Sequence, residues 1–134
     1  MYRITCRVGF EAAHRLRGYN GLCAYVHGHH YVVEATVESR ELDHLSMVTD
    51  FSELKQVLRA CSSERMDHRL VLNPDDDPTL LGLGGVCVMH AGNPTAENMA
   101  REIYRSMILL IPDHTRLVNI RIYETPDCWC DYHE

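Results

Sequence analysis

Two stretches of the sequence decide the fold: residues 2–14 read YRITCRVGFEAAH, and residues 27–39 read HGHHYVVEATVES. In both, apolar residues recur at every second position, which is the spacing of a β-strand with one buried face. The apolar positions carry even numbers in the first stretch and odd numbers in the second. A turn-rich segment, RGYNG at residues 17–21, separates them. We therefore predict that the two stretches pair as antiparallel strands.

Two helices are predicted after this pair of strands. Asp50 followed three residues later by Glu53 is a signature of a helix start, and apolar residues then recur at helical spacing as far as Cys61. Thr95 caps the second predicted helix, which ends at Pro112.

A long loop is predicted between the helices, at residues 73–92. This segment contains prolines, glycines and the acidic run Asp75-Asp76-Asp77. The acidic run is expected to be solvated, and residues 86–89 are expected to form a short strand within the loop.

The C-terminal part predicts two further strands, at residues 117–124 and 128–132. In the first, three apolar residues share one face: Val118, Ile120 and Ile122. The order strand-strand-helix-helix-strand-strand is typical of an α+β domain in which helices cover one face of an antiparallel sheet. The length of 134 residues fits one such domain over residues 1–134.

Composition narrows the class of protein. A net charge of −6 without a long basic stretch argues against nucleic acid as the main partner. No apolar run is long enough to cross a membrane, and the polar start Met1-Tyr2-Arg3 lacks the apolar part of a secretory signal. The six cysteines are irregularly spaced, which favours free thiols in a reducing compartment. We therefore expect a cytoplasmic protein without a membrane partner.

Three histidines fall in phase with the apolar faces of the first two strands. His14 continues the even-numbered face, and His27 and His29 continue the odd-numbered face. If the strands pair with those faces together, three imidazoles converge at one end of the core. Zn²⁺ binds neutral imidazole nitrogen at about 2.0–2.1 Å, and three protein ligands leave the open position of a catalytic site. The alternative is three separately hydrogen-bonded core histidines, but their shared phase favours a metal. His30 is out of phase and is not predicted to be a ligand.

Two further candidates flank the histidines in the sequence. Cys23 lies four residues before His27, and a thiol beside a metal can act as a base or nucleophile. A small buried apolar side chain is an equally good interpretation of Cys23. In Asp67-His68, the carboxylate could hold the imidazole in one tautomer for proton transfer, although adjacent Asp-His pairs also occur by chance.

Glu124 continues the apolar phase of Val118, Ile120 and Ile122, so its carboxylate is predicted to face inward. An inward carboxylate commonly binds a ligand because an unpaired one is costly. The alternative is a strand end that already reaches solvent. The pair Cys128-x-Cys130 resembles half a metal site without a second half, and packing is the better interpretation.

Six motifs occur here in the order typical of the 6-pyruvoyltetrahydropterin synthase family, which the chain resembles over nearly its whole length. They are Phe10-Glu11-Ala12-Ala13-His14, Cys23-Ala24-Tyr25-Val26-His27-Gly28-His29, Asp50-Phe51, Asp67-His68, Asn93-Pro94-Thr95-Ala96-Glu97-Asn98 and Glu124-Thr125. The resemblance implies a tunnelling fold (T-fold), in which the sheets of several subunits join into an oligomeric barrel with sites between subunits. A homo-oligomer, a hexamer or a tetramer, is therefore expected.

The resemblance also implies the chemistry. The substrate would be 7,8-dihydroneopterin triphosphate, with Zn²⁺ on His14, His27 and His29. Cys23 would be the general base, Asp67 and His68 would complete a proton relay, and Glu124 would anchor the pterin. Candidates for holding the triphosphate are three cations: Arg15, Arg17 and Lys55.

The spacing Cys23-x-x-x-His27 is similar to that of the bacterial 6-carboxytetrahydropterin synthases of queuosine biosynthesis. This branch implies 6-carboxy-5,6,7,8-tetrahydropterin as product, with release of triphosphate and acetaldehyde. The 6-pyruvoyl-forming reaction is the alternative within the family. A zinc hydrolase would instead need a carboxylate or histidine base beside a metal-bound water. A non-enzymatic zinc-binding module would close its fourth position, for which Cys23 is available.

Overall fold

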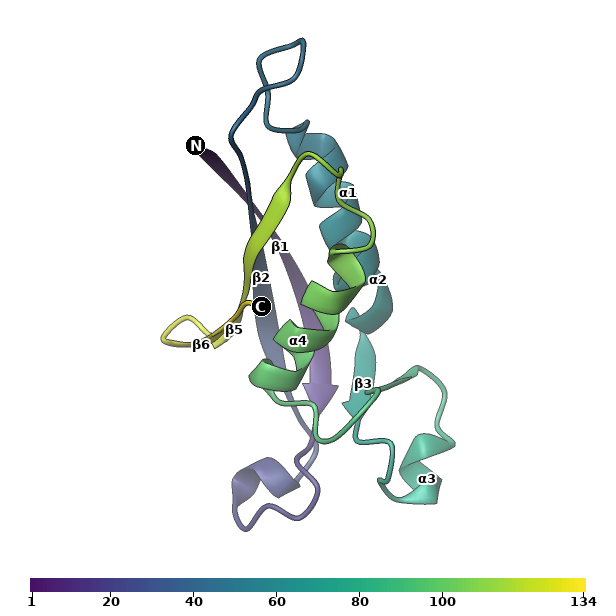
Figure 1. Cartoon of the computed structure of the whole chain (residues 1–134). Helices are drawn as coiled ribbons and strands as arrows, with labels where there is room; N and C mark the ends of the chain where they lie inside the picture. Colours follow the sequence, from purple (N-terminus) through teal and green to yellow (C-terminus); the bar gives the residue numbers. More distant parts are fainter.

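The protein is described from a computed structural model that covers residues 1–134. It contains a six-stranded sheet, four α-helices and one short 3-10 helix. In chain order these are β1 (Tyr2–His14), η1 (Leu22–Ala24), β2 (His27–Ser39), α1 (Phe51–Cys61), α2 (Ser63–Met66), β3 (Arg69–Leu72), α3 (Pro78–Leu81), β4 (Val86–Val88), α4 (Ala96–Met107), β5 (Arg116–Thr125) and β6 (Cys128–Tyr132). The two long helices, α1 and α4, lie along the same side of the sheet (Figure 1).

The sheet has the strand order β4-β3-β1-β2-β5-β6. β1 and β2 pair antiparallel over their full length, from Tyr2 opposite Ser39 to His14 opposite His27, as predicted. β2 with β5 and β5 with β6 are also antiparallel. β3 and β4 instead add in parallel, β3 to β1 and β4 to β3, so the sheet is mixed rather than wholly antiparallel. β3 has only four residues, too few to show a period in the sequence.

A register shift in β5 corrects one detail of the predicted pattern. Between β2 and β5 the pairing shifts at Thr36/Val37, and Leu117 rather than Val118 lies opposite Val37. Leu117 is only 2 % exposed, whereas Val118 is half-buried. Beyond the shift the predicted phase is confirmed, because Ile120 and Ile122 are fully buried. Glu124 itself lies at a second irregularity, where the β5–β6 pairing shifts between Tyr123 and Thr125, and its carboxylate lies on the side of His29.

Both predicted helix caps are present. The Asp50 carboxylate accepts a hydrogen bond from the Ser52 N–H at 2.6 Å, and the Thr95 hydroxyl accepts one from the Asn98 N–H at 3.3 Å. α4 ends at Met107, before the predicted end at Pro112. The buried side of the two helices covers the inward face of the sheet, and the core lies between them. The largest fully buried residues include Leu58, Met99, Ile103, Met107, Tyr31, Val33, Ile120 and Ile122.

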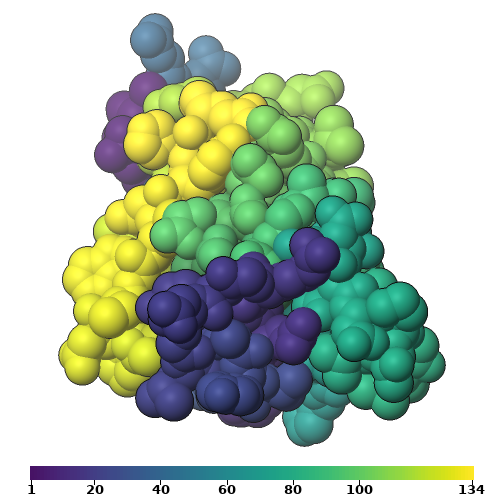
Figure 2. Space-filling model, turned by 90° about the horizontal axis from the view of Figure 1, so that it is seen from below, coloured from purple at the N-terminus to yellow at the C-terminus, as the bar shows by residue number.

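The core lies on one side of the sheet only, between the sheet and the helices, and this packing fixes the position of β1 and β2. Each fully buried Leu or Ile contributes about 1.5–3 kcal/mol, so the paired strands are held firmly on the helix side. The β1–β2 loop at residues 15–26 leaves the sheet at the rim of this core. Viewed from below, this purple loop lies between the yellow C-terminal strands and the teal segment after β3 (Figure 2). None of the helices has the length and apolar character needed to cross a membrane.

Candidate active site

Three histidines meet at the end of the β1–β2 pair, and we call them the histidine cluster: His14, His27 and His29. His14 is the last residue of β1 and lies directly opposite His27, while His29 follows two residues later on the same face of β2. The ring centroids are 4.6 to 5.2 Å apart. One ring nitrogen of each histidine lies within 4.8 Å of the other two. The convergence predicted from strand phase is thus present in the structure.

Two backbone carbonyls fix the tautomers of two of these rings. His14 Nδ1 lies 2.7 Å from the Pro94 carbonyl oxygen, and His27 Nδ1 lies 2.7 Å from that of Tyr25. A carbonyl oxygen only accepts, so both rings carry their proton on Nδ1 and a lone pair on Nε2. The two Nε2 atoms face each other at 3.0 Å. Two lone pairs at this distance form no hydrogen bond and repel, and a cation between them would remove the repulsion.

The third ring supplies a nitrogen without a partner. His29 Nε2 is buried and forms no hydrogen bond. The carboxylate oxygen of Glu124 lies 3.6 Å away, which is too long for one. A buried polar atom left unpaired costs about 1–3 kcal/mol, so this nitrogen is expected to bind something. Three imidazole nitrogens of this kind fit Zn²⁺ or a similar divalent metal.

Burial keeps His14 in the protonation state that binds a metal. His14 is 1 % exposed, and burial lowers its pKa below the usual value for histidine. The ring is therefore neutral at pH 7, which is the form that coordinates a metal. Tyr31 lies beneath it, with its hydroxyl 3.2 Å from His14 Nδ1, and burial raises the pKa of this phenol. Tyr31 thus adds no negative charge to the site.

Cys23 lies in η1, on the loop that joins β1 to β2. Its carbonyl accepts a hydrogen bond from the Leu16 N–H at 2.8 Å, and its half-buried thiol forms none. The group of side chains close enough to share a metal contains the three histidines and no cysteine. Cys23 is therefore close to His27 in the sequence, but it lies outside the group of side chains that could share a metal and outside the cavities that His29 lines.

Asp67 and His68 form the contact that their adjacency suggested. Asp67 Oδ2 lies 2.9 Å from His68 Nδ1, and Asp67 Oδ1 accepts a hydrogen bond from the Glu11 N–H at 2.9 Å. The Glu11 N–H and then His68 lower the pKa of Asp67. His68 and His29 line one surface cavity together with Glu11. The structure thus brings His68, held by Asp67 behind it, to the same cavity as one member of the histidine cluster.

Glu124 lies beside His29 near the end of β5, with its side chain 32 % exposed. Both residues line a cavity of about 570 Å³, together with Tyr123 and Thr125. This volume is in the range of small-molecule sites. Glu124 is therefore half-buried. This lies between the two expectations for it, an inward-facing carboxylate and a strand end that reaches solvent.

Several residues that hold the histidine cluster or its neighbours in place could not be predicted from the sequence. The carbonyls of Pro94 and Tyr25 belong to the backbone, so no side-chain pattern could reveal their contacts with the histidines. Asp76 was expected in a solvated run, but it is buried and forms an ion pair with Arg15. His30, the predicted non-ligand, turns away from the cluster and lies 2.5 Å from Glu11 Oε1.

Comparison with known proteins identifies the family and the fold. Residues 3–134 match the sequence profile described as 6-pyruvoyl tetrahydropterin synthase. A protein of Rickettsia bellii named 6-carboxy-5,6,7,8-tetrahydropterin synthase is 33 % identical over 141 residues, which covers 98 % of this chain and 99 % of the relative.

Solved structures show the same fold. An uncharacterized protein from Wolinella succinogenes superimposes with a TM-score of 0.84 at 23 % identity, covering 98 % of this chain and 97 % of the other. The Caenorhabditis elegans 6-pyruvoyl tetrahydropterin synthase gives a TM-score of 0.74 at 23 % identity, covering 99 % and 95 %. The predicted α+β T-fold is confirmed. With the profile spanning nearly every residue, the chain belongs to the 6-pyruvoyl tetrahydropterin synthase family.

Proposed function

We propose that this protein is a zinc-dependent lyase that converts 7,8-dihydroneopterin triphosphate to 6-carboxy-5,6,7,8-tetrahydropterin, with release of triphosphate and acetaldehyde. The name of the Rickettsia relative, matched over almost the full length of both chains, supports this branch of the family. The observation that carries the metal dependence is the convergence of three imidazole nitrogens, two with fixed lone pairs and one without a partner. We place the reaction in the pathway to queuosine.

His14, His27 and His29 would hold the metal through Nε2. The Pro94 and Tyr25 carbonyls hold the first two rings in the required tautomer. Zinc bound here would polarise the side-chain hydroxyls of the substrate and stabilise negative charge that develops on them. With three protein ligands, a position remains for those hydroxyls.

Proton transfer is assigned to Cys23, Asp67 and His68. The half-buried Cys23 thiol would take the carbon-bound proton of the substrate side chain. Asp67 accepts from His68 Nδ1, which leaves His68 Nε2 to exchange a proton in the cavity shared with His29. This is the orientation that a proton relay requires.

Substrate binding is assigned to Glu124 and Arg17. The Glu124 carboxylate would pair with a ring N–H and the amino group of the pterin, in the cavity that it shares with His29. Arg15 is already paired with Asp76, and Lys55 is exposed on α1. The Arg17 guanidinium forms no ion pair and lies on the loop that follows His14. Arg17 is therefore our candidate for contacting the triphosphate.

We also propose a cytoplasmic homo-oligomer, a tetramer or a hexamer. The strands at the two edges of the sheet, β4 and β6, each pair on one side only. Such edges are available for pairing with another copy of the chain. The six cysteines are all free, as expected for a reducing compartment.

A second candidate is the 6-pyruvoyl-forming reaction, favoured by the description of the matching family. Incubation of the zinc-loaded protein with 7,8-dihydroneopterin triphosphate separates the two by mass spectrometry of the pterin and enzymatic assay of acetaldehyde. We expect the 6-carboxy product and acetaldehyde in equal amounts. The 6-pyruvoyl product without acetaldehyde would favour the second candidate, and absence of turnover would contradict both.

A further inference from the structure

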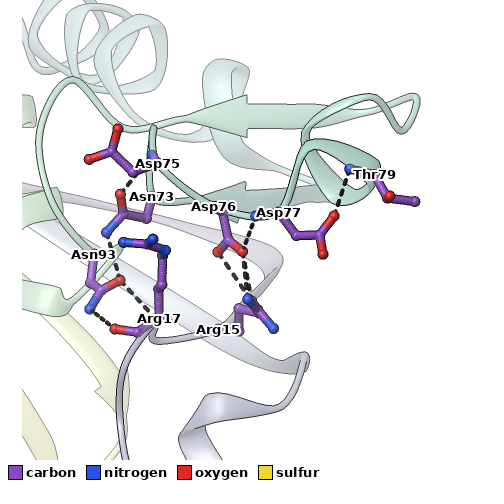
Figure 3. Close-up of polar contacts among 8 residues, drawn as sticks. All are labelled: Arg15, Arg17, Asn73, Asp75, Asp76, Asp77, Thr79 and Asn93. Atoms are coloured by element: carbon purple, nitrogen blue, oxygen red, sulfur yellow. Dashed lines mark hydrogen bonds and ion pairs between the residues drawn. The ribbon is translucent and has the colours of Figure 1, made fainter.

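The segment between β3 and α4, residues 73–95, contacts Arg15 and Arg17, which directly follow β1 (Figure 3). Asp76 of this segment has a fully buried carboxylate, which pairs with the guanidinium of Arg15. Arg15 Nε donates to both carboxylate oxygens, at 3.0 and 3.1 Å, and a terminal nitrogen donates to Oδ1 at 2.6 Å. A buried carboxylate is costly without such a partner, so this pair fixes Arg15 against Asp76.

A second contact involves Arg17, which lies two residues after Arg15 on the β1–β2 loop. The Asn93 side-chain amide pairs with the backbone of Arg17 in both directions. Arg17 N–H donates to Asn93 Oδ1, and Asn93 Nδ2 donates to the Arg17 carbonyl, each at 2.9 Å. The Asn98 side chain in turn donates to the Asn93 carbonyl at 2.9 Å. Asn93 is therefore held on both sides, and its orientation is fixed by a donor and an acceptor together.

The two contacts are joined by Asn73. The Asp76 N–H donates to the Asn73 carbonyl at 3.1 Å, and Asn73 Nδ2 donates to Asn93 Oδ1 at 2.9 Å. Together with the backbone of Leu16, which joins Arg15 to Arg17, these contacts close a ring through Arg15, Asp76, Asn73, Asn93 and Arg17, which we call the loop clamp. Figure 3 shows its Arg15–Asp76, Asn73–Asn93 and Asn93–Arg17 contacts. Such a closed ring restricts the movement of each member more than separate contacts would.

The loop clamp lies next to the hydrogen bond that orients His14. His14 directly precedes Arg15, and Pro94 directly follows Asn93. Both partners of the 2.7 Å contact between His14 Nδ1 and the Pro94 carbonyl oxygen are therefore covalently joined to members of the clamp. The partner of the distal nitrogen fixes the ring orientation of a metal-binding histidine and the direction of its lone pair.

We propose that Asp76 and Asn93 are positioning residues for His14, which hold the Pro94 carbonyl against Nδ1 so that the Nε2 lone pair points into the histidine cluster. Neither residue belongs to the group of side chains that could share a metal, and neither lines the cavities of Glu124 and His68. The inference rests on the metal site of the proposed function. Without the clamp, the ring would sample other orientations and the other tautomer, and metal affinity would fall.

The test compares Asp76→Asn with Asp75→Asn, an identical change one residue away. Asp75 is exposed, and only its backbone N–H is bonded, to Asn73 Oδ1. Zn²⁺ affinity is measured by competition with a chromophoric chelator, beginning with the metal-free protein. Loss of a group that hydrogen-bonds a metal ligand weakens metal binding about 10–100-fold, and because Asp76 acts through Pro94 we expect the lower end, about tenfold, for Asp76→Asn. Asp75→Asn should remain close to wild type.

A second readout separates positioning from general stability. In the metal-free protein, ¹⁵N-histidine NMR reports which His14 nitrogen carries the proton, and thermal unfolding reports stability. We expect Asp76→Asn and Asn93→Ser to mix the Nε2–H tautomer into His14, while wild type and Asp75→Asn keep Nδ1–H. Lower stability with an unchanged tautomer and unchanged zinc affinity would overturn the proposal.

If Asp76→Asn does not fold, Arg15→Lys takes its place, because it keeps the ion pair and removes only the forked hydrogen bonds. It is judged by the same two readouts. A wild-type protein that binds no zinc would contradict the proposed function itself. A wild type that binds zinc, with variants that bind it equally well, would contradict only the role of the clamp.

Discussion

The three members of the histidine cluster are held in different ways, so their substitutions should differ. His14 and His27 each have a carbonyl partner for Nδ1, whereas His29 Nε2 is buried without any partner. In the absence of metal, His29 is thus a source of unfavourable free energy. With metal, it becomes a ligand like the other two.

His29→Leu tests this difference. We expect the metal-free variant to be as stable as wild type or up to about 1 kcal/mol more stable, because an unpaired buried nitrogen is removed. The same variant should lose most of its zinc, since two ligands hold the metal weakly. Urea unfolding and metal analysis check the two parts, and full zinc content would remove His29 from the ligand set.

The pKa of His14 predicts a pH dependence of stability. Burial places its folded-state pKa below the value of about 6.5 expected for the unfolded chain. Between those two values the unfolded chain binds the proton and the folded protein does not, so stability falls as pH decreases below about 6.5. Urea midpoints of the metal-free protein at pH 7.5 and 5.5 measure this. His14→Gln should flatten the dependence, and an equal slope in both proteins would contradict the assignment.

Cys23→Ala should keep the fold and the bound zinc, because the thiol lies outside the group of side chains that could share a metal. It should lose nearly all turnover, because the thiol is the proposed base. Cys87→Ala, a change of another half-buried thiol on β4, serves as the control and should keep activity. Steady-state rates and metal analysis are the measurements. Zinc loss in Cys23→Ala would instead indicate a closed structural site.

Glu124→Gln should weaken a pterin ligand such as sepiapterin and leave zinc content unchanged. The amide presents a donor where the ligand also has one, and a lost charged hydrogen bond costs about 1.5–3 kcal/mol. This corresponds to a loss of affinity of about tenfold or more. Glu53→Gln, on the exposed side of α1, is the matched control. Equal affinity in the Glu124 and Glu53 variants would place Glu124 outside the pocket.

At the scale of the elements, the site depends on where strands and helices begin and end. The full antiparallel register of β1 and β2 brings His14 opposite His27, and the start of α4 places Pro94 against His14. The cap of α4 at Thr95 therefore stabilises both the helix and the residue that orients a ligand.

Thr95→Ala removes that cap. Loss of a capping hydroxyl costs about 0.5–2 kcal/mol, and the 3.3 Å bond to the Asn98 N–H points to the lower end of this range. Thr79→Ala, at an exposed position where the hydroxyl forms no hydrogen bond, is the control. The measurement is the urea unfolding midpoint of each variant, which should be lower for Thr95→Ala than for Thr79→Ala. Equal midpoints in the two variants would show that the cap does not contribute to stability.

Strand phase explains which elements could be predicted from the sequence. Long alternating stretches such as residues 2–14 and 27–39 specify both the strands and the facing sides of their histidines. β3 is too short to alternate, and its parallel pairing depends on the helices that precede it. The register shift at Thr36/Val37 leaves no trace in composition. The carbonyl partners and the buried Asp76 depend on how the loops return, which no local pattern encodes.

At the scale of the whole molecule, one sheet with helices on a single side leaves the other face and two edges uncovered. The cavities that hold Glu124 and His68 open at this uncovered part of the structure, on either side of His29. The side chains proposed for proton transfer by His68, for substrate binding by Glu124 and for metal binding by His29 thus come from strands and loops that only the complete fold brings together. A metal centre with an open position is the feature on which all the proposed chemistry depends.

The visible absorption spectrum of the Co²⁺-substituted protein tests that centre most directly. Three imidazole ligands with an open position predict one Co²⁺ per chain, with d–d bands and no intense thiolate charge-transfer band. His29→Leu should abolish these bands, and Cys23→Ala should leave them unchanged. An intense thiolate band lost in Cys23→Ala would contradict the three-histidine centre and show a closed site, and failure to bind Co²⁺ would contradict a metal centre altogether.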